Sequence, residues 1–599
     1  MREWHASDIE MIYGSIIPAD WRTATVRGEA AESVFDSPAI RLFFYGVLYN
    51  RDVLLYGAAM SNAELATRLY LVDSEHGFSR LDGSFTIVYF TDRECGVVRD
   101  HHGTHCSIYY DEDGSFSTSC FRLAVEDGEV TCDRRSLSHF LQHGLLTVGR
   151  TPFIGICALE AGQVLYARTG GEVKCRSYFA PLSSPLPLTT LSEYATHYMH
   201  LHEQAIRRRI GNSSHVGILL SGGYDSGSNL VALRSIYDGK VSSYSIGFRG
   251  DAWSELPRAR LMSKTFGTSH HEYEIDGTEI AYLPEIIRYL EVPFVEGGLM
   301  VNYCAMRLVG ANKPDVILGG DGSDQYFGTS GREVALYYLT SHAGLHPLMR
   351  LAINLLQRRP FERIAACYRA SYHLDRIIHL LEGERFGFSD TALRSFLRHP
   401  YHDYCAPLIP QADISSFTNL YNQHAQLSDL ETIINRIILF KASRMARMYD
   451  NNLAFPFMDL SLYNFLQHLP VEYKCKGDTA LNIARGRFVS KYLLKYCYKP
   501  KLPEAIASQK KQGGFAPMSL FFDDKSRRDR FKEFILSSSI YDDYLNRKKV
   551  ERFLREYDKV AGDASVWFWY RQNHAIQYFN LLTLVTWWEE FIEHRTVSY

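Results

Sequence analysis

The chain has 599 residues, of which 46% are hydrophobic and 22% are charged, so it exceeds one hydrophobic core and two or more domains are expected. Its formal net charge of −3 gives no general attraction to nucleic acid, and no apolar run is long enough to span a bilayer. The 11 cysteines include no Cys-x2-Cys pair, which is typical of a reduced protein without structural zinc. We therefore expect a cytoplasmic globular protein that binds neither nucleic acid nor membrane.

Residues 1–180 are dominated by short β-patterned runs that Asp/Gly turns separate. Examples are residues 41–45, 84–89 and 162–167. These runs predict a β-rich first domain. The segment 181–195 begins with three closely spaced prolines, with serines between the first two. This composition predicts an extended linker and the entry into a second domain.

Residues 196–599 show a different pattern, in which long helical periodicity alternates with a few buried strands. The strands are expected at 216–220, 243–248 and 316–318. Strand and helix in alternation predict a doubly wound parallel α/β sheet whose ligand lies at the carboxyl ends of the strands. Residues 331–440 are expected to be a helical region, and they contain no motif that indicates a function.

A Ser-Gly-Gly loop follows the strand at 216–220 and precedes a helical segment. Such a loop leaves backbone N–H groups free to bind an anion, and its glycines let a phosphate approach closely. The spacing differs from the Walker loop and from the dinucleotide fingerprint. The loop resembles the pyrophosphate loop of the N-type ATP pyrophosphatases, which split ATP between its α and β phosphates. That resemblance implies that ATP is bound by Leu219, Ser221, Gly222, Gly223, Asp225 and Ser226.

Further segments occur in the order found in asparagine synthetases. They lie at residues 245–248, 255–272, 291–294, 318–328, 444–459, 509–515 and 581–588. Taken together, the segments resemble the asparagine synthetase superfamily, which includes β-lactam synthetase and the lasso-peptide cyclases. The resemblance spans nearly the whole chain. It implies an ATP-dependent enzyme that activates a carboxylate as its adenylate and forms an amide bond.

The resemblance also implies where ATP and Mg²⁺ bind. The backbone at Ile246 and Gly247 is expected to frame the adenine, and Gly320 to lie beside the nucleotide. Asp225 and Asp324 are expected to hold Mg²⁺, which prefers an octahedral, oxygen-only site built from carboxylates and phosphates.

Three residues are implied to act in catalysis. Lys511, in the Gly-rich segment 509–515, resembles the catalytic lysine of the family more closely than its neighbour Lys510, and would stabilise charge on the α-phosphate and on the oxyanion. Either Glu291 or Asp321 would accept the proton of the attacking amine. Both lysines could instead belong to a solvated basic face, and the role of Glu291 could be limited to stabilising a loop.

The first domain resembles the glutamine-hydrolysing domain of the family at residues 45–51, 81–85 and 100–110. In glutamine-dependent members, a cysteine at the mature N-terminus is the nucleophile and its own α-amine is the base. Here Arg2 follows Met1, and Cys95 is the first cysteine. We therefore expect an Ntn-type α+β sandwich, like that of class II glutamine amidotransferases, without its nucleophile. The enzyme would then need a ready-made amine.

The choice of substrate depends on Asp321, which lies three residues before Asp324. At this place β-lactam synthetase has a tyrosine and asparagine synthetase has a glutamate, so an acid points away from the β-lactam branch. The long helical region and the 39 tyrosines and 34 phenylalanines suit a peptide substrate. We therefore predict a lasso-peptide cyclase that joins the N-terminal amine of a ribosomal precursor peptide to an Asp or Glu side chain, with a leader peptidase as partner.

Several alternatives stay open at this point. The chain could be a β-lactam synthetase-like or other small-molecule amide synthetase, or an asparagine synthetase-like enzyme that uses free ammonia. A tRNA-modifying enzyme with a pyrophosphate loop would be expected to show a basic face and often a pair of catalytic cysteines, and neither is evident. A catalytically inactive scaffold would not need to retain Asp225, Asp324 and Lys511.

Overall fold

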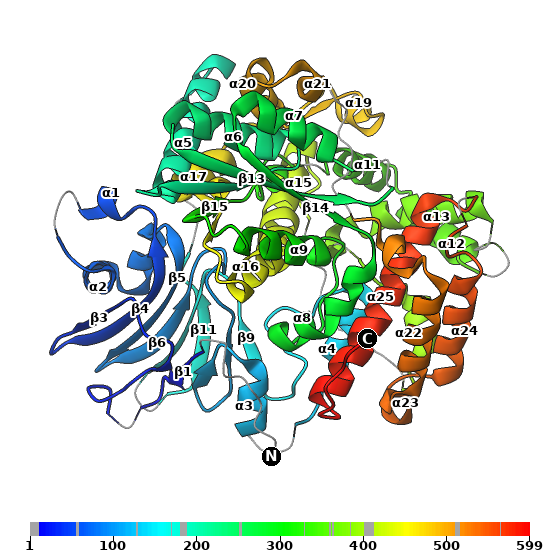
Figure 1. Ribbon diagram of the computed structural model, residues 1–599, viewed down its shortest axis with the longest axis horizontal. Helices are drawn as coiled ribbons and strands as arrows, with labels where there is room; N and C mark the ends of the chain where they lie inside the picture. Colours follow the sequence, from blue (N-terminus) through cyan, green and yellow to red (C-terminus); the bar gives the residue numbers. More distant parts are fainter. Residues whose placement is uncertain are drawn as a thin grey trace.

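The computed structural model describes residues 11–18, 20–55, 59–126, 130–168, 171–179, 188–250, 254–328, 330–358, 361, 364–383, 385–399, 412–508, 516–563 and 565–599. Figure 1 shows a β-rich part in blue and cyan, a second sheet with its helices mainly in green, and a helical part that includes the C-terminal helix in red. In these ranges, no helix is both long enough and apolar enough to cross a membrane.

The β-rich part, which we call the first domain, contains two sheets of antiparallel pairs with strand orders β2-β1-β8-β7-β9 and β11-β10-β6-β5-β4-β3. Its elements are β1 (Ile12–Ser15), β2 (Arg27–Gly28), β3 (Ser33–Asp36), β4 (Ile40–Leu48), α1 (Arg51–Leu55), α2 (Asn62–Asp73), η1 (Ser74–Arg80), β5 (Gly83–Thr91), β6 (Glu94–Arg99), β7 (Ile108–Tyr110), β8 (Ser115–Ser117), α3 (Cys120–Glu126), α4 (Arg134–His143), β9 (Cys157–Leu159), β10 (Gln163–Arg168) and β11 (Val173–Ser177).

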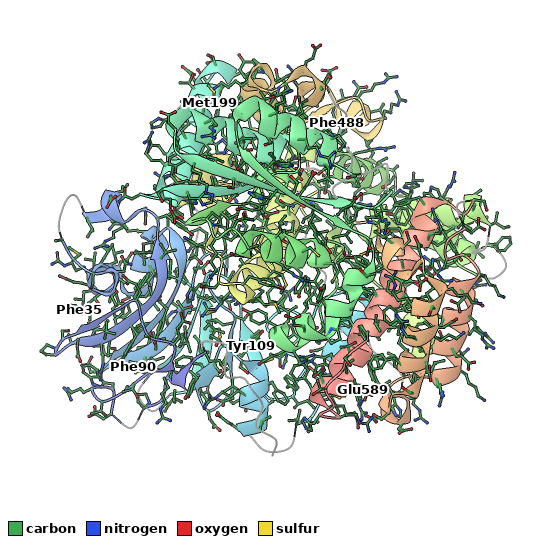
Figure 2. The ribbon with its side chains drawn as sticks, viewed as in Figure 1. Phe35, Phe90, Tyr109, Met199, Phe488 and Glu589 are labelled. Atoms are coloured by element: carbon green, nitrogen blue, oxygen red, sulfur yellow. The ribbon has the colours of Figure 1, made fainter. Side chains whose placement is uncertain are left out.

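Strand β5 explains how the layers of this domain form. Alternate side chains of a strand point to opposite faces of its sheet. Ile87 and Tyr89 therefore pack on the side of α2, whereas Val88 and Phe90 pack against the other sheet. Phe90 is labelled in Figure 2, as is Phe35, which packs against the α2 side. Because β5 is buried on both faces, residues 87–90 are all apolar or aromatic and do not alternate with polar residues, as expected for a strand inside a layered fold.

The second sheet has the strand order β14-β13-β12-β15-β16, and every pair in it is parallel. This sheet and its helices confirm the prediction of an α/β fold. The elements in chain order are α5 (Leu191–Ile210), β12 (His215–Leu219), α6 (Tyr224–Ile236), β13 (Lys240–Phe248), α7 (Leu256–Phe266), β14 (Ser269–Ile275), η2 (Thr278–Tyr282), α8 (Leu283–Leu290), α9 (Leu299–Gly310), β15 (Val316–Leu318), α10 (Ser323–Phe327) and β16 (Leu453–Ala454).

The strands expected at 216–220, 243–248 and 316–318 correspond to β12, β13 and β15. Two strands of the sheet, β14 and β16, were not predicted. Strand β14 is an edge strand with the sequence Ser-His-His-Glu-Tyr-Glu-Ile, which is too polar to read as a buried strand. Strand β16 has only two residues, so no periodicity can reveal it.

The remaining elements are mostly helical, and the region 331–440 is mostly helical in the part that the structure describes. The elements are α11 (Gly331–His342), α12 (His346–Leu356), α13 (Ala365–Ile378), η4 (Leu380–Glu382), α14 (Asp390–Phe396), α15 (Phe417–His424), the π-helix η5 (Ala425–Ile438), α16 (Leu439–Met448), η6 (Pro456–Met458), α17 (Leu460–Gln467), α18 (Val471–Lys474), β17 (Cys475–Lys476), α19 (Ala480–Ala484), β18 (Val489–Ser490), α20 (Tyr492–Tyr498), η7 (Lys499–Lys501), α21 (Glu504–Ala507), η8 (Met518–Phe522), α22 (Lys525–Ser537), α23 (Ile540–Asp543), α24 (Arg547–Asp558) and α25 (Phe568–Phe591).

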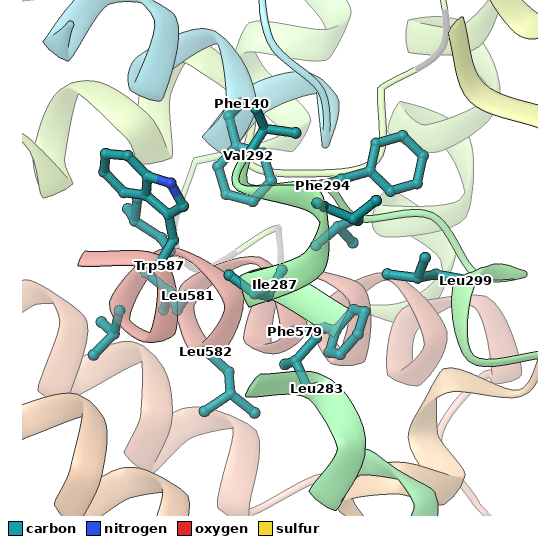
Figure 3. Packing of buried hydrophobic residues seen from close by; sticks show 14 of the residues in the cluster. Phe140, Leu283, Ile287, Val292, Phe294, Leu299, Phe579, Leu581, Leu582 and Trp587 are labelled. Carbon is teal, nitrogen blue, oxygen red and sulfur yellow. The ribbon is translucent and has the colours of Figure 1, made fainter. Parts of the chain in front are cut away.

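A continuous apolar core joins the first domain to the rest of the chain. Figure 3 shows Phe140 of α4, Ile287 of α8 and Trp587 of α25 in this core. Trp587 is fully buried, and its indole Nε1 donates a hydrogen bond to the backbone oxygen of Glu291 at 2.9 Å. The C-terminal helix therefore fixes the first domain against α8.

Buried charges also cross this boundary. Arg209 of α5 donates to both carboxylate oxygens of Asp82, each at 3.0 Å, and to Asp459 at 2.8 Å. Arg444 of α16 donates to Ser107 at 2.9 Å. A buried charge is tolerated only where it is paired and hydrogen-bonded, so these contacts constrain how the first domain sits on the second sheet.

Candidate active site

The loop between β12 and α6 is shaped by its own hydrogen bonds. The backbone N–H of Ser221 donates to the hydroxyl of Ser226 at 3.1 Å, and the N–H of Gly223 lies 3.3 Å from the Ser221 hydroxyl. Gly222 has φ +76°, and a Cβ there would lie 2.5 Å from the Cβ of Arg258. The turn therefore requires glycine at this position.

Helix α6 begins at Tyr224 directly after Gly223, which has no side chain with which to cap the first turn. The first N–H groups of a helix have no partner within the helix, and the helix dipole favours negative charge near them. The loop and the start of α6 together therefore form a suitable phosphate site.

Asp225 in the first turn of α6 and Asp324 in the first turn of α10 point toward the same cation. Nζ of Lys491 lies 2.5 Å and 2.7 Å from the two carboxylate oxygens of Asp225 and 2.6 Å from Oδ1 of Asp324. Burial alone would lower the pKa of Lys491, but the two carboxylates outweigh this effect and its pKa is raised. Lys491 is therefore positively charged at neutral pH.

Asp225 and Asp324 fit a magnesium ion. Both supply hard oxygen donors, they come from different elements, and their distances to Lys491 show that they converge on one small volume. Mg²⁺ is usually held by one or two protein carboxylates together with phosphate oxygens and water. Within the described residues, no group of three or more His, Cys, Asp or Glu side chains is arranged to hold a metal ion.

Asp321 lies beside this pair, in the turn between β15 and α10, and is a candidate base. Its side chain is half-buried. Desolvation raises its pKa to about 6; Lys441 lowers the pKa, whereas Asp225, Asp324 and Glu296 raise it. Lys441 donates to the carboxylate of Glu296. A carboxyl group with such a pKa can gain and lose a proton near neutral pH.

The other predicted nucleotide contacts lie at the same edge of the sheet. Leu219 ends β12 and Ile246 and Gly247 lie near the end of β13, the parallel neighbour of β12. Gly320 follows β15, and a Cβ there would lie 3.2 Å from the backbone nitrogen of Ser226, so Gly320 borders the phosphate loop. The structure therefore brings these residues together with Asp225, Asp321 and Asp324.

Glu291 has a different place from the one predicted for a catalytic base. Its carboxylate accepts hydrogen bonds from the Ser119 hydroxyl at 2.6 Å and from the backbone N–H of Phe121 at 3.0 Å. It ends α8 with φ +59°, a conformation that a residue other than glycine rarely adopts. These contacts favour the alternative in which Glu291 stabilises the structure, here between α8 and α3, and its catalytic role stays a prediction.

The predicted catalytic Lys511 and its alternative Lys510 lie outside the described residues, so their roles stay predictions. The sequence analysis did not find Lys491, Lys441 or Glu296. Lys491 precedes a short helix in a stretch with no glycine motif, and it has φ +51°. No sequence signal marks a lysine that folds back onto two distant carboxylates.

A large cavity opens next to Glu296. Its volume is about 680 Å³, and Glu296 and Gly297 line it together with residues from α11, α13, α14, η5, α24 and α25. None of the residues 219–226 line it. The cavity is therefore separate from the phosphate loop, and Glu296 lies between the cavity and Asp321.

The first domain contains no activated thiol in the part that the structure describes. Burial raises the pKa of each cysteine there, namely Cys95, Cys106, Cys120, Cys132, Cys157 and Cys175. The thiolate is the nucleophilic form of cysteine. These six side chains are therefore poorly suited to attack glutamine.

Comparison with known proteins gives a consistent set of relatives. The model of the family described as asparagine synthase matches residues 197–589. The glutamine-hydrolyzing asparagine synthetase 1 of Bacillus subtilis (strain 168) is 22% identical over 555 residues, which are 88% of this chain and 83% of the relative. The glutamine-hydrolyzing enzyme of Zea mays is 26% identical over 287 residues, 45% of this chain and 43% of the relative. Asparagine synthetase 2 of Oryza sativa subsp. japonica is 26% identical over 310 residues, 47% and 46% of the two chains.

Proposed function

We propose that this chain, which belongs to the asparagine synthase family, closes an amide bond between a carboxylate and an amine of one peptide. Homologues in this family are ATP-dependent, AMP-forming carbon–nitrogen ligases that use ATP with Mg²⁺, which confirms the predicted enzyme class and cofactors. The product we propose is the macrolactam ring of a lasso peptide, formed between the N-terminal amine and an Asp or Glu side chain.

The first step activates the carboxylate. One of its oxygens attacks the α-phosphorus of ATP, the bond between that phosphorus and the bridging oxygen of the β-phosphate breaks, and pyrophosphate leaves. The first N–H groups of α6 would hold the phosphates, and Lys491 would offset the negative charge that builds up there. Mg²⁺, held by Asp225 and Asp324, would supply further positive charge to the phosphate oxygens.

The second step forms the amide. The amine nitrogen attacks the acyl carbon, the bond from that carbon to the AMP oxygen breaks, and the nitrogen loses one proton. Asp321 is the base that the described residues favour, because its pKa of about 6 lets it accept the proton at neutral pH and release it again. Lys511 is proposed to stabilise the oxyanion.

The observation that carries this proposal is the position of Asp321. Its neighbours Asp225 and Asp324 face the phosphate loop, and its neighbour Glu296 lines the large cavity. A base at this place can accept the proton of an amine that arrives from the cavity while the adenylate lies on the side of the phosphate loop. Holding both reacting groups in one site replaces a bimolecular collision by an oriented reaction, which can supply several kcal/mol of the barrier.

Two further observations favour a peptide that brings its own amine. The cavity has room for about 20 water molecules at about 30 Å³ each, far more than a free amino acid needs. The described cysteines of the first domain have raised thiol pKa values, which does not favour hydrolysis of glutamine there. We also propose that a leader peptidase prepares the peptide and can form a complex with this chain.

A second candidate function is the synthesis of asparagine or a related small amide from free ammonia. The similarity to the Bacillus subtilis enzyme over 88% of this chain favours it. A β-lactam synthetase-like reaction is disfavoured by the acid at position 321, where that enzyme type has a tyrosine.

One experiment separates these functions. The protein is incubated with ATP and Mg²⁺ in three parallel sets of reactions. These contain aspartate and ammonia, aspartate and glutamine, or synthetic peptides. The peptides carry a free α-amine and one aspartate whose position is scanned. AMP is measured, and the products are analysed by mass spectrometry. Peptide-dependent AMP release with loss of one water from the peptide supports the proposal. Release of AMP with aspartate and ammonia but with no peptide supports the second candidate.

A further inference from the structure

We infer that the cavity beside Glu296 binds the amine-bearing end of the peptide, with the α-ammonium at Glu296 and large side chains against an aromatic wall. We call it the peptide cavity. This inference rests on the proposed function, because it assigns a place to the peptide of that reaction. The residues that support it most directly are Glu296, Glu333, Tyr368, Tyr372, Tyr570 and His574.

The position of the cavity gives the first argument. Glu296 is shared between the cavity and the charged group around Asp321. Its carboxylate accepts from Lys441 and, at 2.8 Å, from the backbone N–H of Gly298. A group that enters the cavity and reaches Glu296 therefore arrives beside the proposed base, while ATP can occupy the phosphate loop at the same time.

The aromatic wall gives the second argument. The ring of Tyr570 lies 4.6 Å from that of Tyr368 and 4.1 Å from that of His574, and Tyr372 stacks on Trp569 at 6.2 Å between ring centroids. Unlike the fully buried tyrosines of the cores, these rings are only partly buried. Partly buried tyrosine and tryptophan rings offer large contact areas to a peptide at small cost in side-chain entropy.

The distribution of charge gives the third argument. Glu296, Glu333 and Asp375 bring negative charge to the lining from the segment before α9, from α11 and from α13. Lys549 and Arg552 bring positive charge from another wall, α24. A peptide end has a cationic α-amine and, in the proposed substrate, an acidic side chain. Arg376 of α13 also lines the cavity, next to Asp375, so both signs of charge are available to such a ligand.

The wall formed by η5 gives the fourth argument. Ser428 and Ile433 of this π-helix line the cavity, and the same helical segment continues into α16, which carries Lys441. π-Helical segments are rare and are frequent at functional sites. A ligand that contacts η5 therefore touches the element that holds the partner of Glu296.

The test measures binding without chemistry. The scanned peptides, with a fluorophore at the C-terminus, are titrated with the full-length protein in the absence of ATP, and fluorescence anisotropy gives the dissociation constants. Tyr570→Ala is expected to weaken binding by tenfold or more, because truncation of a central aromatic contact has effects of this size. The matched control is Leu351→Ala on α12, whose exposed side chain does not line the cavity; it should bind as the unmodified protein does.

A second pair of measurements tests the orientation. Acetylation of the α-amine removes its charge and should weaken binding to the unmodified protein by about tenfold, as expected for a charge-assisted contact. The same acetylation should have little effect on binding to the Glu296→Gln variant. If acetylation weakens binding to both proteins equally, the amine does not lie at Glu296.

The inference and the proposed function can fail separately. If peptides bind with the expected dependence on Tyr570 but release no AMP with ATP, the cavity assignment holds and the cyclase function fails. If peptides are cyclised while Tyr570→Ala leaves their affinity and KM unchanged, the function holds and the cavity assignment is overturned. Absence of binding by every peptide also overturns the assignment.

Discussion

Lys491, which is buried, forms an ion pair with the half-buried Asp324 in which Nζ lies 2.6 Å from Oδ1, and the same ammonium contacts Asp225. Asp324 belongs to α10, Asp225 belongs to α6, and Lys491 directly precedes α20. The contact therefore brings three separate segments together at the phosphate site. The ammonium is therefore held beside the phosphate loop before ATP arrives, where a positive charge can stabilise the phosphates.

Lys491→Met should lower the rate of pyrophosphate release by on the order of 10²-fold or more, because it removes a preorganised charge from the phosphate site. The rate is measured as ATP–pyrophosphate exchange with the substrate that the function experiment identifies. Lys501→Met is the control, since the ammonium of Lys501 lies near Met199 on the exposed side of this region. Equal exchange rates in Lys491→Met and in the control would contradict the assignment.

Asp225→Asn and Asp324→Asn should each raise the Mg²⁺ concentration needed for half-maximal activity. A neutral amide is a weaker ligand for a hard cation than a carboxylate. The measurement is the activity at saturating ATP as a function of free Mg²⁺. A reduced maximal rate with an unchanged Mg²⁺ dependence would show that these carboxylates act in some way other than metal binding.

The pH dependence should report Asp321. Its pKa is raised to about 6, and a base must be unprotonated to accept a proton, so kcat/KM should fall about tenfold for each pH unit below that value. Glu296→Gln should move this limb to lower pH, because it removes a negative charge that raises the pKa of Asp321 and leaves Lys441 free to lower it. Asp321→Asn should abolish the limb together with most of the activity. A limb that stays in place in Glu296→Gln belongs to another group.

The sequence was sufficient for those parts of the site whose chemistry is written in a local motif. The phosphate loop, Asp324 and Asp321 all follow buried strands, and parallel strands place their carboxyl ends at one edge of the sheet. Short apolar strands such as β12 and β15 were therefore enough to predict where the ligand lies, whereas the resemblance to the family predicted which residues meet there.

The residues that were missed depend on contacts between distant segments. Lys491 reaches Asp225 across 266 positions in the sequence, and Lys441 reaches Glu296 across 145. A single sequence contains no pattern for such pairs. Glu291 depends on such contacts as well: it lies in a segment that resembles the family, and its carboxylate accepts hydrogen bonds from Ser119 and Phe121 of the first domain.

Glu291→Ala therefore tests whether that residue is structural. The substitution leaves the backbone N–H of Phe121 and the hydroxyl of Ser119 without their acceptor, which should lower the free energy of unfolding by about 1–3 kcal/mol for each buried group. Activity well below the unfolding temperature should be unchanged. A large loss of kcat in a variant that is folded at the assay temperature would restore Glu291 as a candidate base.

The ion pair between Arg209 and Asp82 leads to a prediction about the role of the first domain. Both side chains are almost fully buried, and burial raises the pKa of Asp82 whereas the guanidinium of Arg209 lowers it. Asp82→Ala leaves Arg209 with only Asp459 as a carboxylate partner among the contacts described. Removing one member of a buried charge network typically costs about 3–5 kcal/mol.

We therefore expect Asp82→Ala to lower the urea concentration at the midpoint of unfolding of the whole chain. Unfolding is monitored by tryptophan fluorescence and by circular dichroism. Since Asp459 caps α17 through the backbone N–H groups of Ser461 and Leu462, the loss should spread into the second domain. Asp36→Ala, at a pair on the exposed surface with Arg41, is the control and should change the midpoint little. If Asp82→Ala unfolds the first domain alone and leaves ATP–pyrophosphate exchange intact, the synthetase part does not depend on this contact.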